Sequence, residues 1–161
     1  MRKFEIISEE QWAKDISVLD SPKCDIIDHL KPHRSTKYSA GYDFISPIEI
    51  IIPAHGMAKI PTGIKAAMED DEILSIYPRS SIGFKTGIRL ANTVGIVDSD
   101  YYNNSDNEGH IFIKFYNPTD SDYTINIGDK IAQGVFTKYL IVDDEEEIST
   151  ERAGGLGSTG K

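Results

Sequence analysis

The chain has 161 residues, of which 39% are hydrophobic and 27% charged, a composition typical of one globular domain with its own core. The formal net charge of −9 at pH 7 argues against a general nucleic-acid-binding surface. Apolar runs fall short of the roughly 18 residues of a membrane span. The single cysteine, Cys24, excludes a disulfide within the chain and fits a cytoplasmic protein.

The first local signal is a short helix near the N-terminus. Ser8 and Gln11 form a capping box, in which the serine hydroxyl accepts a hydrogen bond from the first helical turn. Trp12 and Ile16 then share one helical face. We predict a helix over residues 8–17 that packs on the domain surface, within an N-terminal extension of residues 1–35.

From residue 40 onward, short β-rich runs alternate with turn residues. The runs cover residues 48–52, 58–60, 64–68, 73–77, 88–90, 94–97, 110–116, 123–127 and 130–142. This spacing is typical of a sandwich or barrel, and no helical period is long enough for βαβ units. We therefore predict an all-β domain over residues 36–142. Residues 143–161 follow it as an acidic linker and a mobile C-terminal lid.

The glycine-rich tail is the first candidate binding segment. Gly155, Gly157 and Gly160 match a dinucleotide fingerprint, but one residue follows Gly160 and the required helix cannot form. Glycine amides with the Ser158 and Thr159 hydroxyls can still wrap a phosphate. The alternative is a flexible terminus without a ligand.

A second candidate anion site follows the predicted strand at residues 73–77. Arg79, Ser80 and Ser81 place a guanidinium fork and two hydroxyls at the strand end, and such a fork suits phosphate. A helical turn with a surface arginine is the alternative interpretation.

Two further side chains are candidates for chemistry. Asp98 directly follows the apolar pair Ile96 and Val97, where a carboxylate can orient water as a general base or simply form a turn. Gln133 lies in an apolar strand, where its amide can donate to an oxyanion or to neighbouring backbone. The four histidines show no metal-ligand spacing, so we expect no zinc site.

Taken in order, five segments resemble the five motifs of the trimeric dUTP diphosphatases (dUTPases). The segments are residues 40–44, 78–81, 92–102, 128–133 and 152–160, and the resemblance covers residues 36–161. Residues 106–110 resemble the longer hairpin of a Gram-positive bacterial or phage subgroup. Each motif alone is unspecific, but five in this order form a strong signal.

The resemblance implies a β jelly roll of the β-clip type that assembles as a homotrimer, with three active sites each built from all three chains. It implies hydrolysis of dUTP to dUMP and pyrophosphate with Mg²⁺, which limits uracil in DNA and supplies dUMP. The metal ion would be held mainly by the triphosphate and water, so missing metal-ligand motifs do not count against the resemblance.

The resemblance also implies a role for each site residue. Asp98 would position and deprotonate the water that attacks the α-phosphorus, and Tyr101 would pack under the deoxyribose. The strand around Asn92 and Gly95 would read the uracil edge through its backbone. Arg79, Ser80 and Gln133 would hold the phosphate chain, and Arg152, Ser158 and Thr159 of the tail would close over the γ-phosphate. The other predicted substrate-binding residues are Ser81, Leu156 and Gly157. Asp43 would lie in the outer shell of the metal ion.

Two departures from the family pattern stand out. Leu156 replaces the phenylalanine that usually stacks on uracil, and leucine cannot stack. Phe112 and Phe115 are candidates to cover the base instead. Residues 102–103 also replace the common Arg-Gly pair after the sugar-packing tyrosine.

Two alternatives remain at this stage. A related deoxycytidine triphosphate deaminase would need a glutamate about where Lys114 stands, and a cation cannot be that base. A non-enzymatic, phage-type regulatory trimer with a protein partner is the second alternative.

Overall fold

The computed structural model describes residues 1–19, 30–150, 152 and 154–155. Among them, no helix combines the length and apolar character that a membrane span requires. The strands are short and pair only antiparallel, as expected where turn residues recur so often.

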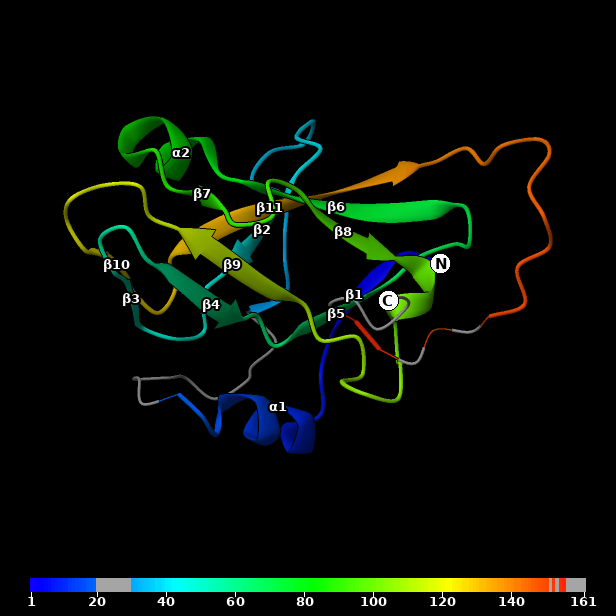
Figure 1. The fold of residues 1–161 in the computed structure, drawn as a ribbon, viewed down its shortest axis with the longest axis horizontal. Helices are drawn as coiled ribbons and strands as arrows, with labels where there is room; N and C mark the ends of the chain where they lie inside the picture. The colour runs from blue at the N-terminus through cyan, green and yellow to red at the C-terminus, as the bar shows by residue number, and fades with distance from the viewer. Residues whose placement is uncertain (20–29, 151, 153, 156–161) are drawn as a thin grey trace.

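Two larger sheets carry most of the strands (Figure 1). The four-stranded sheet has the spatial order β2 (Tyr42–Ile45), β11 (Lys130–Lys138), β6 (Glu72–Pro78) and β8 (Gly95–Asp98). The three-stranded sheet has the order β4 (Met57–Pro61), β9 (Phe112–Tyr116) and β7 (Arg89–Leu90). Two-stranded ladders join β1 (Lys3–Ile6) to β5 (Ile64–Ala67), and β10 (Tyr123–Ile125) to β3 (Ile50–Ile52).

Alternating side chains of these strands form the core. Phe44, Ile60, Leu74 and Phe115 come from both larger sheets and belong to one cluster of buried residues. Burial of such side chains is the main favourable term in folding, at about 25 cal/mol per Å² of apolar surface. The predicted all-β fold with a short helix is confirmed, and it is a jelly roll.

Helix α1 (Glu9–Ile16) forms where the capping box predicts it. The Ser8 hydroxyl accepts a hydrogen bond from the Gln11 amide at 3.1 Å, and Trp12 is buried. Figure 1 shows the helix at the periphery of the domain, beside the strands.

Helix α2 (Ser80–Thr86) lies in one of the predicted anion-binding segments. Arg79 is its N-cap residue, and Gly87 ends it in the left-handed conformation with φ of 74°. The helical alternative therefore describes the local backbone, while Ser80 and Ser81 remain exposed. A short 3-10 helix, η2 (Ser99–Tyr101), follows β8.

Three elements differ from the sequence-based prediction. Strands β1 and β2 were not predicted, because each is short and is stabilised by partners distant in the sequence. β11 ends at Lys138 rather than at residue 142, because Lys138 pairs with Glu72, the first residue of β6, and the ladder ends there.

Candidate active site

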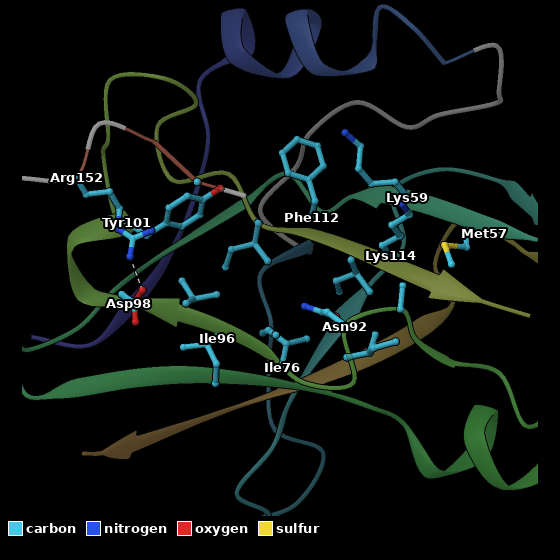
Figure 2. Close-up of a pocket in the computed structure, with 17 residues that line it drawn as sticks. Met57, Lys59, Ile76, Asn92, Ile96, Asp98, Tyr101, Phe112, Lys114 and Arg152 are labelled. Carbon is cyan, nitrogen blue, oxygen red and sulfur yellow. Dashed lines mark hydrogen bonds and ion pairs between the residues drawn. The ribbon is translucent and has the colours of Figure 1, made fainter. Parts of the chain in front are cut away.

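A cavity of about 650 Å³ opens beside β8 and β9. Figure 2 shows Asp98, Tyr101 and Arg152 at one end and Met57, Lys59 and Lys114 at the other. Its lining residues are Met57, Lys59, Ile76, Leu90, Ala91, Asn92, Gly95, Ile96, Val97, Asp98, Tyr101, Ile111, Phe112, Ile113, Lys114, Arg152 and Gly155. The structure thus brings together the predicted residues of the third motif with the described part of the tail. We call this cavity the base-side pocket.

Asp98 is the last residue of β8, so the pairing of β8 with β6 fixes its backbone. Its side chain is 43% exposed, which leaves a carboxylate oxygen accessible to water. Arg152 donates to Asp98 through Nη2 at 2.5 Å and to Asp100 through Nε at 2.6 Å. One tail guanidinium therefore balances two carboxylates at the mouth of the pocket.

Tyr101 lies beside Asp98 at the end of η2. Its hydroxyl donates to the His110 carbonyl at 2.8 Å and accepts from the Asn107 amide at 2.8 Å. Burial raises the pKa of the Tyr101 hydroxyl, so the side chain remains an uncharged phenol at neutral pH. A Cβ on Gly155 would lie 2.5 Å from the Tyr101 ring, so only glycine lets the tail pass so close to it.

The remaining lining of the pocket includes a glycine on β8 and an aromatic ring on β9. A Cβ on Gly95 would lie 3.1 Å from Cβ of its pairing partner Ile76, so the glycine relieves crowding between β8 and β6. Phe112 lines the pocket with the Lys59 ammonium 4.6 Å from its ring centre. Phe115 is fully buried and cannot reach a ligand, which leaves Phe112 as the candidate to cover a base.

Four of the predicted substrate-binding residues, Arg79, Ser80, Ser81 and Gln133, line a second cavity of about 210 Å³. It is lined by Ser35, Ser39, Gly41, Asp43, Arg79, Ser80, Ser81 and Gln133. We call it the phosphate-side pocket. Among the described residues the two cavities share none, so this chain alone does not bring Arg79 and Gln133 into the pocket that holds Asp98.

Asp43 anchors the phosphate-side pocket. Its carboxylate accepts from Ser35 at 2.6 Å and Lys130 at 2.8 Å, and Arg79 Nε lies 3.1 Å away. Burial opposes its ionisation, but the bonds from Lys130 and Ser35 and the charge of Arg79 outweigh burial and lower the pKa of Asp43. The carboxylate is therefore charged, and it orients the guanidinium of Arg79.

Gln133 is held by its neighbours in the sheet. It pairs with Asp43 on β2 and with Tyr77 on β6, and its amide nitrogen lies 3.4 Å from the Pro78 carbonyl. A Cβ on Gly41 would lie 2.4 Å from the Gln133 amide oxygen, so a larger residue there would displace the Gln133 amide.

Several predicted residues lie outside the described part of the chain. They are Leu156, Gly157, Ser158 and Thr159. The sequence did not single out Asp100, Asn107 or His110 as site residues. Asp100 had a usable signal, because it stands two residues after Asp98 in the same turn. His110 and Asn107 had none, because their roles depend on contacts that only the fold creates.

Comparisons with known proteins agree with this geometry. The dUTPase family model matches residues 29–160. A deoxyuridine 5'-triphosphate nucleotidohydrolase from Lactococcus lactis is 50% identical over 131 residues, covering 80% of this chain and 87% of the relative.

Solved structures share the fold. The crystal structure of dUTPase from Streptococcus mutans superposes with a TM-score of 0.74 and 37% identity, over 88% of this chain and 98% of that one. A mutant dUTPase from phage phi11 of Staphylococcus aureus has a TM-score of 0.64 and 18% identity, over 93% and 99%, and shows likeness of fold alone. The five motifs, the pocket around Asp98 and these matches place the chain in the dUTPase family.

Proposed function

We propose that this protein hydrolyses dUTP to dUMP and pyrophosphate, with Asp98 as the general base. The observation that carries the proposal is the position of Asp98, fixed at the end of β8 beside Tyr101 and open to water. The carboxylate takes a proton from a water molecule as the water oxygen bonds to the α-phosphorus. The bond from the α-phosphorus to the bridging oxygen then breaks, and pyrophosphate carries away the electron pair.

The base-side pocket supplies selectivity in this proposal. Tyr101 packs under the deoxyribose, where its ring leaves no space for a 2′-hydroxyl. The turn and strand around Asn92 and Gly95 approach the uracil edge through the backbone, too closely for the methyl group of thymine. Phe112 covers a face of the base, which compensates for the leucine at position 156.

A homotrimer completes the site in this proposal. Asp98 and Arg79 line different cavities of one chain, so a full set of catalytic and phosphate-binding groups requires a second copy. Large apolar side chains are also exposed in this chain, and Phe84, Leu140 and Ile141 are examples. Burial of such residues between copies supports a symmetric assembly.

The tail also contributes, and here the structure differs from the sequence-based expectation. The resemblance implies sites built from all three chains, whereas in this single chain Arg152 contacts Asp98 of the same chain. Residues 139–150 are mostly exposed and form a connection that, if extended, spans roughly 40 Å. The same contacts can therefore form within a chain or between chains. In either case Arg152 lies close enough to meet the terminal phosphates.

Mg²⁺ fits this site as an ion carried by the substrate. Among the described residues, no group of three or more His, Cys, Asp or Glu side chains is arranged to hold a metal ion. Both Asp43 oxygens contact other side chains, which leaves it at most a contact through water. The mutant dUTPase of phage phi11 coordinates a structural Mg(II) ion. When bound to the triphosphate, Mg²⁺ would offset charge on the leaving pyrophosphate.

The experiment that tests the proposal measures pyrophosphate release from dUTP, dTTP, dCTP and UTP with Mg²⁺ present. We expect rapid release from dUTP and slow release from the other three. Ammonia release from dCTP would instead identify a deaminase, an outcome that Lys114 in the pocket wall argues against. Absence of turnover with every nucleotide would contradict the proposed function and leave the regulatory alternative.

A further inference from the structure

We propose that helix α1 is a positioning element of the nucleotide site, and that Asp15 acts through the His110 side chain on Tyr101. This inference rests on the proposed role of Tyr101 as the residue that packs on the sugar. The family model begins to match at residue 29, and α1 lies before that point. The helix is therefore an addition to the part of the chain that the family model covers.

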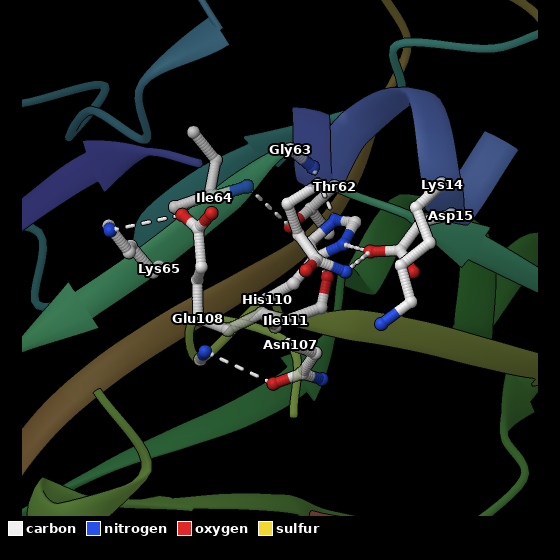
Figure 3. A network of polar contacts seen from close by, with 12 residues as sticks. Lys14, Asp15, Thr62, Gly63, Ile64, Lys65, Asn107, Glu108, His110 and Ile111 are labelled. Carbon is white, nitrogen blue, oxygen red and sulfur yellow. Dashed lines mark hydrogen bonds and ion pairs between the residues drawn. The ribbon is translucent and has the colours of Figure 1, made fainter. Parts of the chain in front are cut away.

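The His110 ring is fixed by two hydrogen bonds inside the domain (Figure 3). The Gly63 amide can only donate, so Nε2 of His110 accepts its hydrogen bond at 2.9 Å. Nδ1 therefore carries the proton and donates it to the Asp15 carboxylate at 2.5 Å. Gly63 and Asp15 together therefore fix the tautomer of a fully buried ring, and Asp15 holds its Nδ1 side in place.

The backbone of His110 connects its fixed ring to Tyr101. Its carbonyl accepts the Tyr101 hydroxyl at 2.8 Å. The Asn107 amide donates to the same hydroxyl, so the phenol is held by two contacts from one loop, residues 102–110. A Cβ on Gly109 would lie 2.6 Å from the Tyr101 carbonyl oxygen, which shows how tightly this loop encloses the tyrosine.

Helix α1 and its N-cap form hydrogen bonds with the same loop, residues 102–110, at two further points. At its start, both the amide and the hydroxyl of Ser8 donate to the Glu108 carboxylate. Near its end, the Lys14 ammonium donates to the Asp106 carbonyl at 3.1 Å. Contacts at both ends of the helix hold the loop over a span of residues, so the helix limits how far Tyr101 can shift. A ring held in this way keeps its steric selectivity against ribose.

The test compares kcat and KM for dUTP and UTP among variants of the full chain. Asp15→Ala removes the acceptor for His110, and we expect the dUTP/UTP ratio of kcat/KM to fall about three- to tenfold, a value in the lower part of the range of coupling within one hydrogen-bonded network. Asp15→Asn keeps an acceptor oxygen and should restore most of the ratio. Glu10→Ala removes an exposed carboxylate from the same helix and serves as the matched control, with an unchanged ratio.

A double-mutant cycle separates positioning from general stability. Tyr101→Phe keeps the ring but removes the hydroxyl, and alone it should lower the dUTP/UTP ratio. In that background, Asp15→Ala should have no further effect on the ratio, because the link is already broken. An equal effect of Asp15→Ala in both backgrounds would overturn the inference.

The inference does not depend on one variant being soluble. If Asp15→Ala does not fold, the Tyr101→Phe variant tests the inference. An unchanged dUTP/UTP ratio of kcat/KM in that variant would show that the hydroxyl contact does not govern selectivity. A wild-type chain that releases no pyrophosphate from dUTP would contradict the proposed function instead, so the two failures are distinguishable.

Discussion

At the residue scale, the Asp98 carboxylate is the proposed general base. We predict that Asp98→Asn lowers kcat by about 10²- to 10⁴-fold, because an amide of the same shape cannot accept a proton. Binding of dUTP should be retained, because Arg152 loses a partner that competes with phosphate. Pyrophosphate release gives the first quantity and calorimetric titration of the variant with dUTP gives the second. Turnover within tenfold of wild type would exclude Asp98 as the base.

A second prediction at this scale concerns the face of the base. Phe112 lines the pocket, whereas Phe115 is buried in the core, so Phe112→Ala should raise KM for dUTP. A stacked ring contributes about 0.5–1.5 kcal/mol beyond its buried area, which corresponds to roughly two- to tenfold. Adding Leu156→Phe to this variant should lower KM again. Equal KM values for Phe112→Ala and wild type would show that another group covers the base.

Single residues also show where sequence reasoning reaches its limit. Asp98, Tyr101 and Gly95, which the third motif proposes as site residues, all line one pocket. It did not indicate His110, whose partner Asp15 is 95 positions away in the sequence. A histidine without ligand spacing carries no local signal, because its function depends on what the fold places against each ring nitrogen.

At the scale of elements, local signals predicted some segments and missed others. The capping box predicted α1, because capping depends on residues within one turn. Strand β1 was missed, because it pairs with β5, more than fifty residues further along the chain. The sequence predicted where β11 begins but not where it ends. Its last residue is the one that pairs with the first residue of β6, and that pairing exists only in the fold.

The buried contact between His110 and Asp15 of α1 predicts that the free energy of unfolding depends on pH. Burial lowers the pKa of His110 more than the Asp15 carboxylate raises it, with smaller effects of Lys59 and Glu108. The unfolded chain therefore takes up this proton at a higher pH than the folded chain. Stability is fully present above the unfolded pKa of about 6.5 and declines as the pH falls through the lowered folded value.

Denaturant titration between pH 8 and pH 5.5 measures this effect. We expect the free energy of unfolding of the wild type to fall across the range, and that of His110→Gln to fall less. The carboxylates with lowered pKa values, among them Asp43 and Glu108, lose their contribution only at more acidic pH. Parallel pH profiles for the two proteins would contradict the assignment to His110.

At the scale of the whole molecule, the separation of the two pockets makes a prediction about assembly. Two inactive variants, Asp98→Asn and Arg79→Ala, should restore activity when refolded together. If each site takes Asp98 from one chain and Arg79 from its neighbour around a three-fold axis, every mixed trimer has one complete site. Random mixing makes about three quarters of trimers mixed, so about one quarter of wild-type turnover should return.

Each variant refolded alone is the control, and activity no higher than theirs would contradict a site shared between chains. The same mixture made with Asp98→Asn and a chain that lacks residues 151–161 reports the origin of the tail. Recovery to about one quarter places the tail on another chain. Absence of recovery places it on its own chain, as Arg152 lies in this structure.

The ion pair between Arg152 and Asp98 has a consequence for the timing of the reaction. In the proposed reaction the Arg152 guanidinium leaves the Asp98 carboxylate and binds a terminal phosphate. Closure of the tail therefore depends on the difference in free energy between these two ion pairs. A terminal phosphate carries more charge than a carboxylate and would draw the arginine away, which would release the Asp98 oxygen that the arginine occupies. Once pyrophosphate departs, the arginine would return to the carboxylates and occupy that oxygen again until the next substrate arrives.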